Sequence, residues 1–145
     1  MEIKPLVASV LGKATDEHWG QVLQMPGAYG LIEIDDPSGG ARERGISCLA
    51  WLSEKVSTGN LNLVEIEAIA EELKNEPVET LILLIPLHTT IHVVLRGKGG
   101  VYLKRADAFS VLLSGQGAVS GDVKEKDTLI LASRAFTEAV DVHEL

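Results

Sequence analysis

The 145-residue sequence has little cysteine, few aromatic side chains and no long apolar run. Its one cysteine, Cys48, can form no internal disulfide, so a reducing compartment is the default. The longest apolar run, Leu81–Leu87, is too short to cross a bilayer. The apolar N-terminal stretch carries Glu2 and lacks a clear cleavage site, which indicates a first strand rather than a signal peptide. We therefore expect a soluble, cytoplasmic protein with no membrane partner.

Basic side chains are also scarce, with 13 Lys and Arg against 21 Asp and Glu and a net charge of −8. Such a surface repels nucleic acid and anionic membranes. Four cations are spread thinly between Arg96 and Arg105, where they indicate solvated strand ends, so we expect no nucleic-acid partner. Aromatic residues make up only 4%, which gives little sign of a large interface anchored by aromatic side chains and leaves the oligomeric state open.

What the chain does have is a sufficient share of apolar residues, 46%, for a core of its own. A domain of about 150 residues buries roughly 68–70% of its unfolded surface and needs no disulfides. No linker or internal repeat divides the sequence, so we expect a single domain over residues 1–145.

The first part of the chain predicts three short strands and a helix. Apolar runs of strand length occur at Leu6–Leu11, Trp19–Leu23 and Tyr29–Ile34, and the last of them ends at a pair of aspartates. Cys48 falls on the apolar side of the helix that follows, which predicts a buried, inert thiol. Helical spacing places four larger apolar residues on one face of this helix: Ile46, Leu49, Leu52 and Val56.

A second helix begins at a capping box, Asn62 with Glu65 three residues on. Its apolar stripe consists of Leu63, Ile66, Ile69 and Leu73. Strand-length apolar runs follow at residues 80–87, 91–95, 101–103, 108–113, 119–123 and 128–132, and 136–140 reads as a last helical turn or strand. Turns such as Arg96–Gly100 separate them, which predicts a meander of antiparallel hairpins. The order of strands, helices and strands predicts an α+β domain with helices packed on sheet.

Four motifs in this order resemble those of the PPM (PP2C-type) metal-dependent protein phosphatases. Residues 13–18, KATDEH, stand where the family has Arg-x-x-Asn-Glu-Asp. Residues 36–40, DPSGG, resemble its Asp-Gly-x-Gly-Gly turn before a helix. Residues 97–102, GKGGVY, are similar to its Gly-Asp-Ser-Arg-x-Tyr segment, and residues 126–135, KDTLILASRA, to its Gly-Asp-x-Leu-Leu-Leu-x-Ser-Asp-Gly strand. The resemblance implies a PPM-like β-sandwich of mainly antiparallel strands, flanked by the two central helices.

The family resemblance also implies a metal site, and here the sequence departs from the family. PPM enzymes hold two Mg²⁺ or Mn²⁺ ions between carboxylates at the edge of the sandwich, and the metals supply a hydroxide for attack on phosphate. His18 stands in place of the first metal-binding aspartate, and Arg134 in place of the aspartate of Ser-Asp-Gly. Asp36 keeps the bridging position, although Pro37 replaces the glycine after it, and the family's late aspartate motif has no clear counterpart.

The remaining candidates for a vestigial metal site are Asp36, Asp35, Glu17 and His18, with Lys13 as a candidate for phosphate binding. Hard divalent cations require several oxygen ligands, so we expect no metal cofactor, or Mg²⁺ or Mn²⁺ if a site survives. Arg134 is positioned by the motif to pair with Asp36 or Glu17 and fill the space. Aspartates before Pro-Ser-Gly-Gly are also common turn and helix-cap residues, and that interpretation stays open.

Three hypotheses follow from the sequence. The first is a catalytically inactive PPM-like domain, a pseudophosphatase that binds or regulates a protein partner. The second is an active Mg²⁺- or Mn²⁺-dependent serine/threonine phosphatase with a reduced metal site. The third is a small α+β assembly protein without an enzymatic role, for example a homodimer formed through an exposed strand edge.

Overall fold

The computed structural model describes residues 6–9, 11–57 and 59–141. In chain order its elements are β1 (His18–Met25), β2 (Ala28–Asp35), α1 (Ala41–Val56), α2 (Leu63–Glu71), β3 (Val78–Leu87), β4 (Thr90–Gly97), β5 (Gly99–Arg105), β6 (Ala108–Ser114), β7 (Gly117–Asp122), β8 (Thr128–Ser133) and α3 (Arg134–Ala139).

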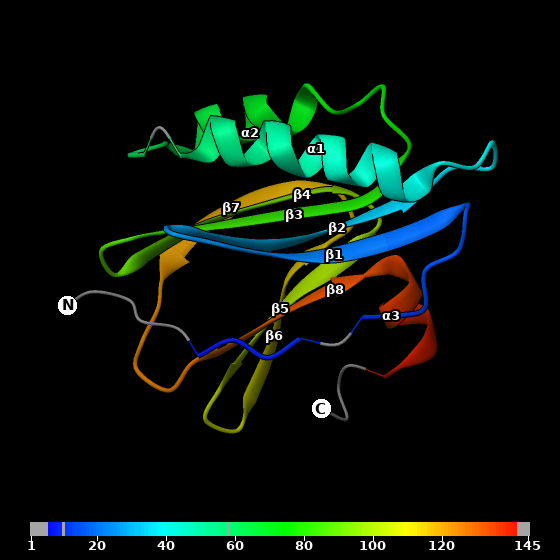
Figure 1. Ribbon diagram of the computed structural model, residues 1–145. Helices are drawn as coiled ribbons and strands as arrows, with labels where there is room; N and C mark the ends of the chain where they lie inside the picture. Colours follow the sequence, from blue (N-terminus) through cyan, green and yellow to red (C-terminus); the bar gives the residue numbers. More distant parts are fainter. Residues whose placement is uncertain (1–5, 10, 58, 142–145) are drawn as a thin grey trace.

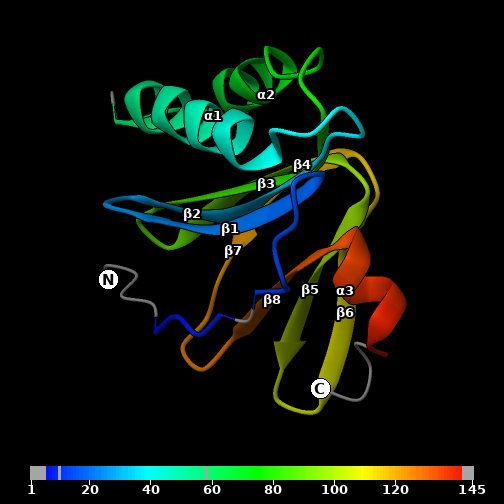
Figure 2. The same cartoon turned by 45° about the vertical axis from the view of Figure 1, so that its right-hand side comes forward.

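The strands form two antiparallel sheets, and the fold is α+β as the sequence predicts. The larger sheet has the order β1-β2-β3-β4-β7 and the smaller one the order β6-β5-β8. Helices α1 and α2 cover one face of the larger sheet, and the smaller sheet lies against its other face (Figures 1 and 2). Helix α1 packs on β1 and β2, while α2 packs on β4 and β7.

Along β1 and β2, successive side chains point alternately toward the helices and toward the smaller sheet. A two-residue turn, Pro26-Gly27, joins these strands, and Gly27 supplies the positive φ of 78° that the turn needs. Trp19 and Ile34 are register partners buried beneath the helices. Leu31 lies three residues before Ile34 on the same strand, so its side chain points to the opposite face of the sheet. It packs in the apolar cluster between the two sheets.

Helix α1 buries a different face from the one that its larger apolar residues predict. Leu52 and Val56 are buried as expected, but Ile46 is 44% exposed. Small residues take its place, since Ala41, Gly45 and Cys48 complete the buried face. The reason is the Trp19 ring: a Cβ on Gly45 would lie 2.1 Å from Trp19 Cε3. The helix therefore turns its smallest residues toward the largest side chain of β1.

Helix α2 confirms its predicted start and its apolar stripe. The Asn62 side chain accepts a hydrogen bond from the Glu65 N–H at 2.8 Å, and the Glu65 side chain accepts one from the Asn62 N–H at 3.3 Å. Ile66 is fully buried, and Leu73 is buried just beyond the helix end. None of the helices in the described part of the chain is long and apolar enough to cross a membrane.

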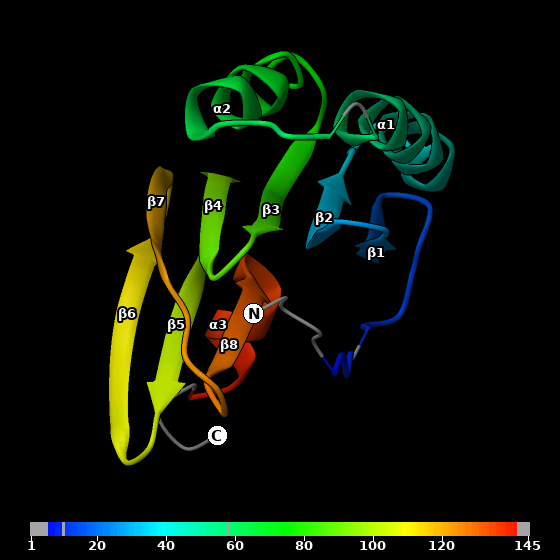
Figure 3. The same cartoon turned by 90° about the vertical axis from the view of Figure 1, so that its left-hand side faces the viewer.

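The second half has strands where they are expected, but the predicted simple meander is wrong. Residues 96–100 form no hairpin turn, because β4 and β5 belong to different sheets and the chain passes from one to the other there. Gly97 and Gly99 have φ of 81° and 133°, and a Cβ on Gly97 would lie 2.2 Å from the Glu79 carbonyl oxygen. The links from β6 to β7 and from β7 to β8 also change sheets (Figure 3).

The strand predicted at Leu6–Leu11 is wrong for the residues that the structure describes there. Residues 6–9 and 11 have no regular secondary structure, and position 10 lies outside the described residues. Leu6 is fully exposed and Leu11 half exposed, so the described residues of this run join no sheet. Apolar character alone predicted the strand, and a strand forms only where a neighbour supplies hydrogen bonds.

Candidate functional site

The turn between β2 and α1 holds the paired aspartates, and it separates them. Asp35 is exposed, whereas Asp36 is buried. The segment before β1 closes over this turn: the Asp36 N–H donates to the Glu17 carbonyl oxygen at 2.7 Å, and the Ala41 N–H donates to that of Asp16 at 3.0 Å. The start of α1 and the approach to β1 are thereby fastened together at one end of the large sheet.

The Asp36 carboxylate accepts hydrogen bonds at one oxygen and forms an ion pair at the other. Its Oδ1 accepts hydrogen bonds from the Ser38 N–H at 3.0 Å and from Ser38 Oγ at 2.6 Å. Its Oδ2 lies 2.7 Å from Arg44 Nε. The two bonds from Ser38, aided by the charge of Arg44, hold the pKa of Asp36 below its ordinary value. A carboxylate that accepts from the residue two positions on closes a turn, which is the structural alternative left open by the sequence.

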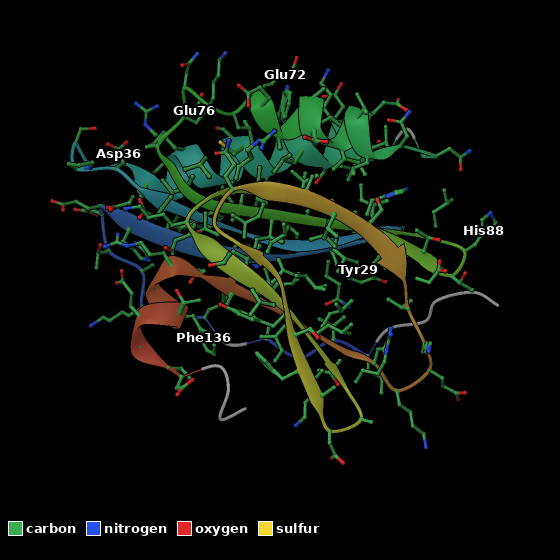
Figure 4. All side chains as sticks on the ribbon, turned by 180° about the vertical axis from the view of Figure 1, so that it is seen from behind. Tyr29, Asp36, Glu72, Glu76, His88 and Phe136 are labelled. Atoms are coloured by element: carbon green, nitrogen blue, oxygen red, sulfur yellow. The ribbon has the colours of Figure 1, made fainter. Side chains whose placement is uncertain are left out.

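Arg44, which sequence reasoning missed, links this turn to the segment after α2. Its Nη1 lies 3.7 Å from a Glu76 carboxylate oxygen, while its Nε faces Asp36. Figure 4 shows Asp36 and Glu76 on the same side of the molecule. The sequence did contain a signal for this pair. Arg44 lies one turn into the helix that follows Asp36, and that spacing brings the two side chains together.

Arg134 makes other ion pairs than those with Asp36 or Glu17 that the motif indicated. Its Nη1 lies 2.7 Å from Glu79 Oε1, and its Nε lies 3.0 Å from Glu138 Oε1. The hydrogen bond to Glu79, followed by that to Glu138, raises the pKa of the guanidinium above its ordinary value. The arginine thus fastens the end of β8 to β3, and it brings a positive charge where the family resemblance implies a metal ligand.

His18 faces a second buried carboxylate, Glu33, that sequence reasoning also missed. His18 Nε2 lies 3.8 Å from Glu33 Oε2, and the Glu33 side chain is only 8% exposed. Glu33 sits between Ile32 and Ile34, which face the helices, so strand alternation puts its side chain on the opposite face of the sheet. That alternation in the sequence was the signal, and it directs His18 and Glu33 away from the helices.

The candidate metal ligands therefore do not converge. Asp36 is bound by Ser38 and Arg44, Asp35 and Glu17 are exposed, and His18 is directed to Glu33. Lys13, the candidate phosphate-binding residue, is exposed in the segment before β1. Among the residues that the structure describes, no three His, Cys, Asp or Glu side chains are grouped so as to hold a metal ion. These residues do not fit the two-metal centre that the family resemblance implies.

A broad groove of about 710 Å³ adjoins Arg44 on the outer side of the helical layer. It runs between α1 and the segment that follows α2, and Glu72 and Glu76 lie on its far side (Figure 4). Cys48 reaches its floor, where burial raises the pKa of the thiol above its ordinary value, as expected for an inert cysteine. The groove is lined by Glu43, Arg44, Ser47, Cys48, Trp51, Lys55, Glu72, Leu73 and Glu76.

No protein-family model, no curated protein and no solved structure matches this chain. The structure defines its class directly: an α+β domain of two antiparallel sheets with three helices among the described residues.

Proposed function

We propose that this chain is a catalytically inactive PPM-like domain that acts in the cytoplasm as a binding module. The observation that carries the proposal is the state of Asp36, the one carboxylate that keeps its place in the family's metal motifs. Ser38 binds one of its oxygens, and the other, which accepts no hydrogen bond, faces the Arg44 guanidinium in an ion pair. The carboxylate therefore serves the β2–α1 turn, and its charge is already balanced by Arg44.

The arrangement of elements supports the PPM-like part of the proposal. The DPSGG motif lies between the end of β2 and the start of α1, which is the strand-to-helix turn that the resemblance implies. Two antiparallel sheets lie face to face with α1 and α2 on one side, which agrees with a sandwich flanked by helices (Figure 1).

The chemistry of the site supports the inactive part. A two-metal phosphatase needs several carboxylate oxygens around each ion to fix the metals and the attacking water. Arg134 stands at one such motif position and binds Glu79, and His18 stands at another and faces Glu33. A cation and an imidazole do not replace two aspartates as ligands for Mg²⁺ or Mn²⁺.

The groove beside α1 supports the binding part. Trp51 lines the groove with its ring, over which Lys55 Nζ lies at 5.5 Å, and three glutamates outnumber the two cations of the lining, Arg44 and Lys55. The chain as a whole carries a net charge of −8. Aromatic residues are the common anchors of protein interfaces, and complementary charge speeds and orients association. The partner that fits this groove is a basic segment of another protein with an apolar side chain for Trp51.

Calorimetric titration with Mn²⁺ and Mg²⁺ tests the loss of the metal site, with an aryl phosphate assay on the same samples. We expect neither saturable binding nor metal-dependent turnover in the wild-type chain. Asp36→Asn is the informative variant, and Asp127→Asn is its matched control because Asp127 is also a buried aspartate paired with an arginine. Saturable binding that Asp36→Asn abolishes and Asp127→Asn keeps, together with turnover, would establish the reduced-site phosphatase instead.

A separate titration tests the groove. A short basic peptide with one leucine should change the fluorescence of Trp51, and Glu72→Lys should weaken that binding because it reverses a charge on the groove wall. Glu125→Lys, in the exposed turn between β7 and β8 and outside the groove lining, makes the same charge reversal and should weaken binding less. Equal weakening by both variants would show a general charge effect and count against the groove.

A further inference from the structure

Strand β1 is an edge of the large sheet that lacks the usual protection against pairing. Among the described residues it pairs only with β2. Its eight residues, HWGQVLQM, contain no lysine, arginine, carboxylate or proline. Natural edge strands usually carry such residues, or a bulge, because an open row of backbone groups recruits another strand.

The hydrogen bonds of Thr15 show which backbone groups of β1 point outward. The Thr15 N–H donates to the His18 carbonyl oxygen at 2.8 Å, and the His18 N–H donates to Thr15 Oγ1 at 3.0 Å. Both backbone groups of His18 thus face away from β2. Since direction alternates along a strand, those of Gly20, Val22 and Gln24 face outward too.

The Gln21 side chain agrees with this assignment. Its amide nitrogen donates to the Val22 carbonyl oxygen at 3.4 Å, a long bond to an oxygen that the β1–β2 ladder does not use. The open row on this edge therefore consists of three residues with outward backbone groups, Gly20, Val22 and Gln24.

We propose that β1 pairs with β1 of a second copy of this chain, antiparallel about a two-fold axis at Val22. In that register Val22 faces its own copy, and Gly20 faces Gln24 in both directions, so all three outward residues are used. The pairing then ends without conflict. The next position would set His18, whose backbone groups Thr15 already binds, against Pro26, which has no N–H.

The position of α1 is compatible with the same two-fold axis. Helix α1 packs on both β1 and β2. Strands lie about 4.8 Å apart, so a helix above the β1–β2 seam stands two strand spacings, about 10 Å, from its copy. That separation is close to the 8–10 Å at which helices pack.

The side of α1 toward this edge is suited to contact. Ser53 Oγ lies 3.0 Å from the sulfur of Met25, the last residue of β1, which marks the side of the helix above this strand. Ile46, two turns earlier on the same side, is 44% exposed. An exposed isoleucine beside an uncharged edge gives two copies of a chain with net charge −8 a surface on which they meet with little repulsion.

Strands β6 and β8 are the other edges without a charged residue, as Ala108–Ser114 and Thr128–Ser133 show. Strand β8 contacts β2 and β3 of the large sheet and runs directly into α3. Strand β6 continues through residues 115 and 116 into β7 of the other sheet, so it turns away within one strand length (Figure 3). Among the described residues, no helix packs on β6 as closely as α1 packs on β1.

Sedimentation velocity of the full chain over a concentration series tests the proposal. The wild type should sediment with twice the monomer mass at high concentration. Val22→Lys should give monomers, because two introduced ammonium groups would face each other at the axis, and like charges directly opposite are unfavourable. Val111→Lys, the same substitution on β6, should leave the dimer intact. Circular dichroism confirms that each variant folds.

Gln24→Pro provides a second variant if Val22→Lys fails to fold. Gln24 is exposed, and its N–H points away from β2, so proline removes an intermolecular donor while sparing the β1–β2 ladder. It should shift the dimer to at least tenfold higher concentration. A monomeric wild type, a dimer that survives Gln24→Pro, or a dimer lost only in Val111→Lys would each overturn the proposal. Failure of the metal or peptide titrations would leave it untouched.

Discussion

The two sheets of this domain differ in how completely they are covered. In the large sheet, Leu83 on β3 and Val93 on β4 are 0% exposed, because helices lie on one face and the smaller sheet on the other. In the small sheet, none of the seven residues of β6 is buried. Its outer face is contacted at one end by α3, where Phe136 packs on Tyr102 (Figures 1 and 4). The large sheet therefore contains most of the buried core, and the small sheet buries apolar side chains mainly on the face that it turns toward the large sheet.

The small sheet also has an ion pair, at the end where β5 finishes. Arg105, the last residue of β5, contacts both oxygens of Asp127 through Nε at 2.8 Å and Nη2 at 2.6 Å. The Lys124 N–H also donates to Asp127 at 2.8 Å, and the carboxylate is only 4% exposed. This bidentate pair ties the end of β5 to the turn before β8.

The largest difference between the sheets should appear with equal truncations. Leu83→Ala in the large sheet should cost about 3–5 kcal/mol of unfolding free energy, because it leaves a cavity in a fully buried layer. Leu129→Ala on β8 removes the same atoms from a half-buried site and should cost less than half as much. Urea unfolding of both variants measures the difference. Equal losses would show that the small sheet is packed as tightly as the large one.

A smaller effect should follow from adding a methyl group. Gly45→Ala forces a Cβ against the Trp19 ring and should cost about 1–3 kcal/mol through overpacking. Gly121→Ala on the edge strand β7 meets no atom within 4 Å and should be neutral or slightly stabilising. Thermal unfolding of both variants tests how tightly α1 packs against Trp19. A neutral Gly45→Ala would mean that the helix moves away freely.

The smallest effect should be the pH dependence of the small sheet. The Arg105 hydrogen bond lowers the pKa of Asp127 to about 2, from an ordinary value of 3.8. Because the folded pKa is the lower one, the stabilisation is present above pH 4 and is lost as the pH falls toward 2. Asp127→Asn should flatten stability between pH 4 and 2 relative to the wild type. Unchanged acid sensitivity in the variant would assign it to other carboxylates.

The sequence predicted the α+β class, the two central helices and the positions of most strands, because apolar periodicity reports burial directly. It could not predict which sheet each strand joins. A glycine-rich segment such as residues 96–100 can form a hairpin turn or connect strands of two different sheets, and here it does the second. It also misplaced the buried face of α1, where contact with Trp19 favours Gly45 over the larger Ile46.

The candidate site was predicted less well than the fold. Asp36 was identified, with turn closure as one of its two interpretations, but its partner Arg44 lies on the next helix and was missed. Glu33 was missed because the sequence does not show whether its side chain points to solvent or to a buried face of the sheet. Side-chain partners depend on tertiary contacts that single motifs do not encode.

The central claim is that Asp36 serves the β2–α1 turn and binds no metal. The most direct measurement is urea unfolding of the wild type and Asp36→Asn, each with and without millimolar Mn²⁺. A ligand that binds the folded state raises its stability by mass action. We predict that Asp36→Asn lowers the unfolding midpoint and that Mn²⁺ changes neither protein. A midpoint raised by Mn²⁺ in the wild type, and unaffected by Mn²⁺ in Asp36→Asn, would contradict this account.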